Sequence, residues 1–495
     1  MRRNEPQSES SMMMPFTCLY KLPVIAFAIV SFSLGELGDG LNVFQGIYLV
    51  GIGWNEGSIG IALSLMGLTA LLCQTMAGDI VDKTTFDRRY FLVAASIFTA
   101  VSASTVLLVR EGNVDHMLIY ISKVIEGIAS SFIGPCLAAL TMACFGPDQF
   151  DAVMASNILW GHIGSVIAAV LAGGTAYILY PNIKYCFLVI GFSALVAVLF
   201  IGYLPQGDTL MGRGFKHIKT EEEESNEQPV ENLNVQSTSS NSATPSSQEA
   251  ARFSLMNSAS TAIPDMPEAA SYRDVFFEQN TYILCITGFF FHFANANVLL
   301  VLGELMGGEN DDGSVKQSAI PLIAGAIVTA QITMAAATLG GDYLTARGMG
   351  RKPIFLAGLL TLPMRCALII YWKDAGEGYL LSTQVFDGLG GGFFGLLHPY
   401  LVADITFGTG RFNVVMGLTA SCFGLGSTLS NFFGQMVVEK LGHVASLSGS
   451  LLLSFIPIAI FAMFMAETKG HRGETGDAIV QKHAVEEKMK YVEMA

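Results

Sequence analysis

The stretch Gly78-Asp79-Ile80-Val81-Asp82-Lys83 stands between two long apolar runs of this 495-residue chain, at 57–77 and 90–109. Basic residues follow it in Asp87-Arg88-Arg89. Each run is long enough for a helix to cross a hydrocarbon layer of about 30 Å. The loop therefore predicts that the chain leaves a membrane near Gly78 and enters it again near residue 90.

The composition of the whole chain favours a membrane protein. Hydrophobic residues make up 52% and charged residues 14%, whereas about a quarter of the residues of a soluble protein are charged. The mean hydropathy is +0.50. Backbone polar groups cannot stay unpaired in lipid, so spans are helices or barrel strands, and these long runs do not alternate as barrel strands do. We predict an all-α membrane protein with twelve transmembrane helices, at about 22–50, 57–77, 90–109, 117–145, 153–180, 184–204, 281–303, 319–341, 353–372, 379–407, 413–438 and 446–466.

The two halves of the chain look like copies of one another. A second charged stretch, Gly341-Asp342-Tyr343-Leu344, follows the predicted span 319–341, as the first follows 57–77. Other paired features are Glu126-Gly127 with Asp387-Gly388, Phe145-Gly146 and Phe150 with Phe407-Gly408 and Phe412, and Asn42-Val43 with Asn297-Val298. The pairs predict two six-helix pseudo-repeats with a binding site at their interface.

Polar segments divide the chain further. We predict a tail at 1–21, a six-helix bundle at 22–204, a linker at 205–275, a second bundle at 276–466 and a tail at 467–495. The linker is rich in Ser, Asn, Gln, Glu and Pro, which cannot bury enough apolar surface to fold alone, so we expect disorder there. Most of the 27 lysines and arginines lie on one side if both termini and the linker are cytosolic, and the positive-inside rule favours that orientation.

Several function classes are not supported. The net charge of −14 comes largely from acidic clusters in the polar stretches, and nothing suggests a nucleic-acid partner. The cysteines are spread singly, without the spacing of a zinc site or a disulfide framework. No HExxH, nucleophile–base pair or ATP-binding loop occurs, so we expect no enzyme activity, no cofactor and no metal.

Six plus six helices with a glycine–acid–basic loop after the second helix of each half resemble the major facilitator superfamily. The family's loop reads roughly Gly-x-x-x-Asp-Arg/Lys followed by basic residues. The first copy matches at Gly78, Asp82, Lys83, Arg88 and Arg89, and the second keeps Gly341, Arg347, Gly350, Arg351 and Lys352 but has Thr345 in place of the acid. The resemblance implies rocker-switch alternating access, with these loops latching the cytosolic side. The alternative is a basic loop that only sets orientation.

Ionisable groups at bilayer depth are costly and mark functional sites. They fall mainly on the helices that line the central cavity in this family, and we expect cavity or proton-coupling roles for Glu36, Asp39, Asn42, Lys123, Glu126, His292, Asn295, Asn297, Asp387 and His398. Asp39 or Glu126 is the predicted proton carrier. The alternative is a static salt bridge in which Lys123 neutralises an acid on the first helix. Arg365 is expected to pair with an acid, or to snorkel toward the membrane surface, rather than to bind substrate.

We therefore expect a secondary active transporter of the plasma membrane, a monomer that exports a small organic molecule in exchange for protons. The usual helix 4 arginine of proton-coupled relatives is Lys123 here, and the Gly-Pro motif of many antiporters is absent from the fifth helix. The alternatives are an uptake permease for a sugar or organic acid and a non-transporting nutrient sensor. The arginine-rich signature of sugar porters after the sixth helix is missing.

Overall fold

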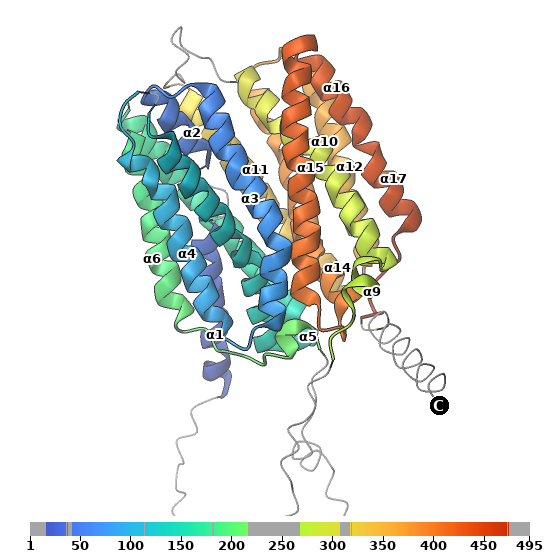
Figure 1. Ribbon diagram of the computed structural model, residues 1–495. Helices are drawn as coiled ribbons and strands as arrows, with labels where there is room; N and C mark the ends of the chain where they lie inside the picture. The colour runs from blue at the N-terminus through green and yellow to red at the C-terminus, as the bar shows by residue number, and fades with distance from the viewer. Residues whose placement is uncertain are drawn as a thin grey trace, which may run out of the picture.

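The computed structural model describes residues 16–35, 37, 42–112, 114–180, 183–215, 268–306, 317, 319–472 and 474. Throughout these ranges the regular structure is helical, without a strand, which confirms the predicted all-α class (Figure 1). The predicted linker 205–275 and the two predicted tails lie largely outside the described residues. Residues 205–215 and 268–275, at the two ends of that linker, are ordered and in contact with the helices.

The helices of the first half correspond to the predicted apolar runs. They are α1 (Phe16–Gly35), α2 (Asn42–Gly51), α3 (Glu56–Lys83), α4 (Arg88–Ser104), η2 (Thr105–Leu108), α5 (His116–Ile178), η3 (Ile183–Phe187), α6 (Leu188–Ile201) and η4 (Met211–Arg213). The predicted span 22–50 is thus α1 and α2, with residues 36 and 38–41 between them not described.

The second half begins with a short helix before its long ones. Its elements are α9 (Tyr272–Phe276), α10 (Gln279–Met306), α11 (Ala319–Ala346), α12 (Arg351–Tyr371), α13 (Glu377–Ser382), α14 (Gln384–Thr406), α15 (Phe412–Leu441), α16 (His443–Leu453) and α17 (Phe455–Phe464).

Within the described ranges, nine helical stretches are long and apolar enough to cross a membrane. One of them, α5, is 63 residues long and covers two predicted spans, because the chain turns at Gly146, where φ is 71° and ψ is 174°. Only glycine adopts this backbone conformation without strain, and Pro147 then starts the next helical segment. The shorter α1 and the glycine-rich α14 are not among the nine.

Capping residues define where α3 and α4, the helices on either side of the first charged loop, begin. The Asn55 side chain accepts a hydrogen bond from the Ser58 N–H at 2.7 Å before α3 begins. Asp87 does the same for the Arg89 N–H at 2.9 Å before α4. Such caps satisfy first-turn N–H groups that have no partner inside the helix. The loop between α3 and α4 is therefore short and ordered.

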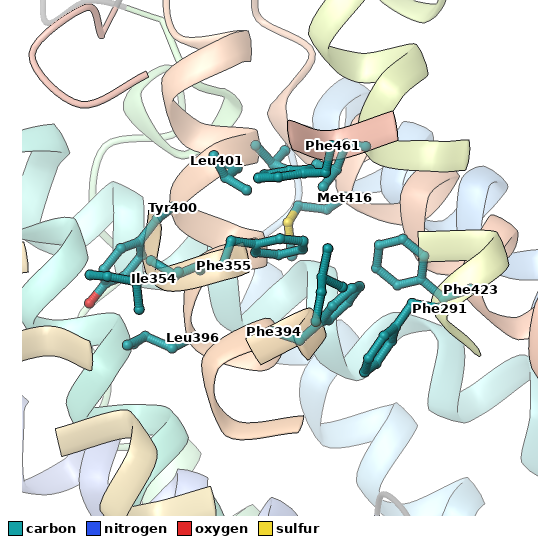
Figure 2. Close-up of a cluster of buried hydrophobic side chains, with 14 of the residues drawn as sticks. Phe291, Ile354, Phe355, Phe394, Leu396, Tyr400, Leu401, Met416, Phe423 and Phe461 are labelled. Atoms are coloured by element: carbon teal, nitrogen blue, oxygen red, sulfur yellow. The ribbon is translucent and has the colours of Figure 1, made fainter. Parts of the chain in front are cut away.

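Two hydrophobic clusters form the interior. One is drawn from residues between Ala26 and Leu204, with Ile320 added from the second half. The other is drawn from residues between Ala270 and Met465, with Ala138, Met142, Phe150, Met154 and Ala155 added from α5. Figure 2 shows the aromatic centre of the second cluster, where the rings of Phe355 and Phe461 lie 4.4 Å apart. The halves therefore share buried surface through α5.

Two pairs of helices join the halves. In Figure 1 α3 and α15 lie side by side near the lower end of the molecule, and they are among the most extensively packed pairs in the structure. The second pair is α11 with α5. We call the end that carries Lys83, Phe412 and residues 205–215 and 268–276 the linker end; it is the lower end in Figure 1.

Candidate functional site

At the linker end, Asp82 of α3 binds the start of α15. Its side chain is buried and accepts hydrogen bonds from the Asn413 N–H at 3.2 Å, from Asn413 Nδ2 at 2.8 Å and from the Val414 N–H at 2.8 Å. First-turn N–H groups lack intrahelical partners, and the N-terminus of a helix carries a partial positive charge. A carboxylate from the first half therefore caps a helix of the second half.

Two glycines make this contact possible. A Cβ on Gly78 would overlap the Asn413 carbonyl, and a Cβ on Gly417 would overlap the Gln74 carbonyl. The backbones of α3 and α15 thus touch where the family-like loop begins. The acid and the glycine of the first charged stretch act together across the two halves.

The basic residues of this first stretch make the following ion pair and hydrogen bonds within their own half. Lys83 pairs with Asp79 at 2.7 Å. Arg88 Nη2 donates to the Thr209 carbonyl at 3.0 Å, and Arg89 Nη1 donates to the Leu204 carbonyl at 2.6 Å. Arg88 and Arg89 therefore hold residues 204–209, where the chain leaves α6, against α4.

The second charged stretch joins the halves through different residues. Arg351 forms an ion pair with Asp404 of its own half and, through Nη2, with Asp151 of α5 at 2.7 Å. Arg472 binds the same two acids, at 2.7 Å from Asp151 and 2.8 Å from Asp404. Thr345, which stands where the acid is expected, donates to the Asp342 carbonyl at 2.8 Å. At this stretch the halves are therefore joined by ion pairs from Arg351 and Arg472 to Asp151, rather than by an acid in the position of Thr345.

The other predicted residues of this stretch stay within their half. Gly341 packs against Leu396 of α14. The Arg347 guanidinium lies 4.2 Å from the centre of the Tyr343 ring. The Lys352 N–H donates to Glu467 at 3.2 Å. All three contacts lie within the second half, and the last of them is at the start of α12.

Asp151, Arg472 and Asp79 were not predicted as site residues. The sequence held one usable signal, because Asp151 follows Phe150 as Asn413 follows Phe412, and these phenylalanines had been paired as corresponding positions. The rings of Phe150 and Phe412 are 5.6 Å apart. The residue after each phenylalanine bonds to the opposite half.

Lys123 and Glu126 form a buried ion pair in α5. Lys123 Nζ lies 2.8 Å from Glu126 Oε2, and both side chains are at most 4% exposed. Lys123 also donates to Gln45 Oε1 of α2. The alternative in which Lys123 neutralises an acid on the first helix involves Glu36 and Asp39, which lie outside the described residues, as does the side chain of Asn42. Among the described residues, the carboxylate that pairs with Lys123 is that of Glu126, on the same helix.

A corresponding cluster occurs in the second half. Arg365 Nη1 lies 2.6 Å from Asp387 Oδ1, and the Arg365 side chain is 1% exposed. Asn295 of α10 bonds to both, at 3.1 Å from Arg365 and 3.3 Å from Asp387. Gln384 Oε1 accepts from Arg365 Nη2 at 3.1 Å. Arg365 thus pairs with an acid, as expected from the sequence.

The remaining predicted cavity residues separate into two groups. His398 Nε2 lies 2.6 Å from Thr419 Oγ1, and the His292 ring stacks on Phe423 with 5.3 Å between centres. Asn297 instead bonds to residues of α15 and α16, at Ser430, Gln435 and Ser446. Its neighbour Asn295 faces Asp387, so the turn of the helix directs Asn297 away from the charged cluster.

Hydrogen bonds between side chains also cross between the halves deeper in the helices. His162 Nδ1 of α5 lies 2.7 Å from Gln331 Oε1 of α11. Thr75 Oγ1 of α3 lies 3.0 Å from Ser421 Oγ of α15. Together with the bonds at the linker end, they hold both helix pairs that join the halves.

Comparisons with known proteins agree with this architecture. The family profile described as Major Facilitator Superfamily matches residues 22–214. Two relatives from Mycobacterium tuberculosis, of strains CDC 1551 / Oshkosh and H37Rv, are each described as an uncharacterized MFS-type transporter. Each is 29% identical over 448 residues, which covers 90% of this chain and 93% of the relative.

A solved structure has the same fold. It is the MFS proton:xylose symporter XylE bound to 6-bromo-6-deoxy-D-glucose, with a TM-score of 0.64 and 13% sequence identity over 94% of this chain and 99% of that one. At this identity the likeness concerns the fold. The profile, the relatives and the fold agree with the charged loops and the helices that join the halves, and the chain is similar to major facilitator superfamily proteins: to the family profile over residues 22–214 and to the two relatives over 90% of its length.

Proposed function

We propose that this protein is a secondary active transporter that exports a small organic molecule in exchange for protons by alternating access. In this proposal the chain has twelve spans, counting α5 as two and the pairs α1–α2, α13–α14 and α16–α17 as one each. The linker end faces the cytosol of a cell whose plasma membrane holds the protein, as the distribution of basic residues favours.

The observation that carries proton coupling is the buried pair of Lys123 and Glu126. Burying a charge inside a membrane is costly unless the charge is paired. A proton on Glu126 would remove the partner of Lys123 and leave an unpaired ammonium group, which a substrate or a movement of the halves would have to compensate. Protonation and conformation are linked by that cost.

Alternating access is supported by the contacts at the linker end. Asp82 with Val414, and Asp151 with Arg351 and Arg472, join the halves at this end by polar bonds. The Asp151 side chain is 30% exposed, so water can replace its ion pair when the halves separate. Export rather than uptake is supported by the missing arginine-rich signature after the sixth helix.

The test is untargeted mass spectrometry of medium and extract from cells that express the chain. The comparison is with Asp39→Asn/Glu126→Gln and with Glu377→Gln, a control at the exposed first residue of α13. A compound enriched outside and depleted inside with the native chain and the control, but not with the double variant, is the expected result. Movement in the opposite direction would overturn export in favour of uptake. Equal profiles for all proteins, in several hosts, would favour the sensor.

The proton requirement is tested separately in proteoliposomes once a transported compound is known. An imposed pH gradient should drive transport by the native chain and leave Glu126→Gln unable to respond to the gradient. Full pH-driven transport by Glu126→Gln would show that this carboxylate is a static partner of Lys123.

A further inference from the structure

Tyr272, the first residue of α9, lies between charged groups of both halves. Its hydroxyl donates to Asp79 Oδ1 of α3 at 2.5 Å. The Arg411 guanidinium lies 4.0 Å from the centre of its ring and Lys83 Nζ lies 5.2 Å from it. Arg411 Nη1 is also 3.6 Å from Asp79. One aromatic side chain thus connects an acid and a lysine of the first half with an arginine of the second.

The segment that carries Tyr272 is fixed to the second half. The Ala270 N–H donates to the Thr409 carbonyl at 2.9 Å, and Arg411 Nε donates to the Ala270 carbonyl at 2.9 Å. Val275 is 1% exposed and belongs to the hydrophobic cluster of the second half. Residues 270–276 are therefore anchored on the second half, and the side chain of Tyr272 reaches the first.

The other flank of the linker makes the reverse connection. The Asp208 N–H donates to the Ala143 carbonyl at 2.9 Å, which fixes this segment to α5. Farther along, the Gly408 N–H donates to the Gly214 carbonyl at 2.6 Å, and Asn413 Nδ2 donates to the Gly212 carbonyl at 2.8 Å. Each flank of the linker is thus anchored on its own half and bonded to the other.

We propose that residues 270–276 form a second latch at the linker end, in which Tyr272 is the positioning residue that holds Asp79 and Lys83 of the first half. The proposal rests on the alternating access proposed above. This latch differs from the contact of Asp82 with α15 because one of its two partners, Tyr272, belongs to the linker flank. Closure of the linker end is thereby coupled to the position of that flank.

The chemistry suits a contact that opens and closes. A tyrosine hydroxyl on a carboxylate is a charge-assisted bond, and an arginine over an aromatic face adds a cation–π attraction. Lys83 is 58% exposed and Asp79 26% exposed, so water can replace their contacts when the halves separate. The ring stays on Arg411 of its own half, which keeps Tyr272 in place for the next closure.

A corresponding tyrosine occurs at the second charged stretch. The Tyr400 hydroxyl lies 3.1 Å from Asp342 Oδ1, and Asp342 follows Gly341 as Asp79 follows Gly78. The same hydroxyl lies 2.6 Å from the Asp151 carbonyl of the first half. The acid after each glycine therefore receives a tyrosine hydroxyl where the halves meet, but Tyr400 comes from a fully buried helix position and Tyr272 from the linker.

Hydrogen–deuterium exchange of the full chain in lipid nanodiscs tests the latch without a substrate. The variants are Tyr272→Phe, which keeps the ring, and Tyr272→Ala, which removes it, with Tyr282→Phe as control at an exposed position on α10. We expect exchange in segments 268–277 and 406–416 to rise about tenfold with Tyr272→Phe, since one hydrogen bond to a charged group has about this effect on an opening equilibrium, and to rise further with Tyr272→Ala, which also removes the ring from Arg411 and Lys83. Segments at the opposite end, such as 52–60, should keep native rates.

A double-mutant cycle identifies the bond. Asp79→Asn and Tyr272→Phe combined should raise exchange no more than the stronger single variant, because each removes the same contact. Native exchange at 406–416 in Tyr272→Ala would overturn the latch, and so would additive effects of the two single variants or a rise along the whole chain. These readouts do not require transport, so the latch can stand if export fails.

Discussion

The carboxylate of Asp82 accepts a hydrogen bond from the Val414 backbone N–H at 2.8 Å, which joins the last turn of α3 to the first turn of α15. The two residues are far apart in the sequence and belong to different halves. Asn413 adds two more bonds to the same carboxylate. The contact gives the first charged stretch a physical role that orientation in the membrane does not require.

Replacing Asp82 by Asn should open the linker end. The amide loses the charge and presents N–H groups to donors, and hydrogen bonds to charged groups contribute about 1.5–3 kcal/mol each. Spin labels at the exposed positions Phe86 and Ala346, in a background without the native cysteines, would report the separation of the halves. We expect longer distances in Asp82→Asn and native distances in the control Asp374→Asn, whose side chain is 87% exposed. A native distance distribution in Asp82→Asn would contradict the role assigned to this residue.

Gly78→Ala should prevent close packing of α3 on α15. Its new methyl group would overlap the Asn413 carbonyl, and overpacking typically costs about 1–3 kcal/mol. Gly67→Ala on the same helix is the matched control, because no atom lies within 4 Å of its new Cβ. There the substitution should be neutral or stabilising, since alanine favours a helix over glycine by about 1 kcal/mol. Thermal unfolding in detergent would compare the two, and equal shifts would argue against the close approach.

Breaking the pair of Arg365 and Asp387 should be more harmful than removing it. Arg365→Met leaves a buried carboxylate without its cation, at a cost of about 3–5 kcal/mol. The double variant Arg365→Met/Asp387→Leu leaves no unpaired charge and should recover much of that stability. Lys373→Met serves as the control, because its pair with Asp374 is exposed and contributes about 0–1 kcal/mol. Stability equal to or below that of the single variant would show that the charges do not act as a pair.

Glu467 should make the linker end sensitive to acid. Burial raises the pKa of its carboxyl, but backbone N–H groups of Arg351–Lys352 and Thr468–Lys469 outweigh it and lower the pKa below its ordinary value of 4.5. A lowered pKa favours the ionised form in the fold, so this contribution is complete above the unfolded pKa and is lost as pH falls through the folded pKa.

We therefore expect the thermal midpoint of the native protein to fall, as the pH drops through and below the ordinary carboxyl pKa of 4.5, more steeply than that of Glu467→Gln. The exposed Glu377→Gln should follow the native curve. If native and Glu467→Gln curves run parallel over this fall in pH, the carboxylate does not hold the start of α12.

The apolar runs were sufficient to predict the all-α class because lipid allows few alternatives for unpaired backbone groups. They were less informative about boundaries. The turn between the two spans within α5 depends on the backbone angles at Gly146, which hydropathy does not report. The ordered flanks at 205–215 and 268–276 are short and polar, and their order comes from bonds to distant residues rather than from their composition.

The site was predictable where residues on one helix are neighbours by spacing, as with Lys123 and Glu126, which are three positions apart. It was not predictable where partners come from distant segments. Asp151 with Arg351, and Asp79 with Tyr272, meet only after the helices pack. Asn297 shows the opposite difficulty, because its polarity suggested a cavity residue, whereas its contacts with Ser430 and Ser446 join helices.

The crossed anchoring of the two linker flanks has a consequence for protein engineering. A fluorescent domain or an affinity tag inserted between residues 216 and 267 would leave the contacts of both flanks with the opposite half intact. A deletion that extended past Gly212 or past Tyr272 would remove the contact made by that flank. If the chain were expressed as two fragments divided inside 216–267, each fragment would keep the linker flank that bonds to the other half. We therefore expect the two fragments to associate through these contacts when they are expressed together.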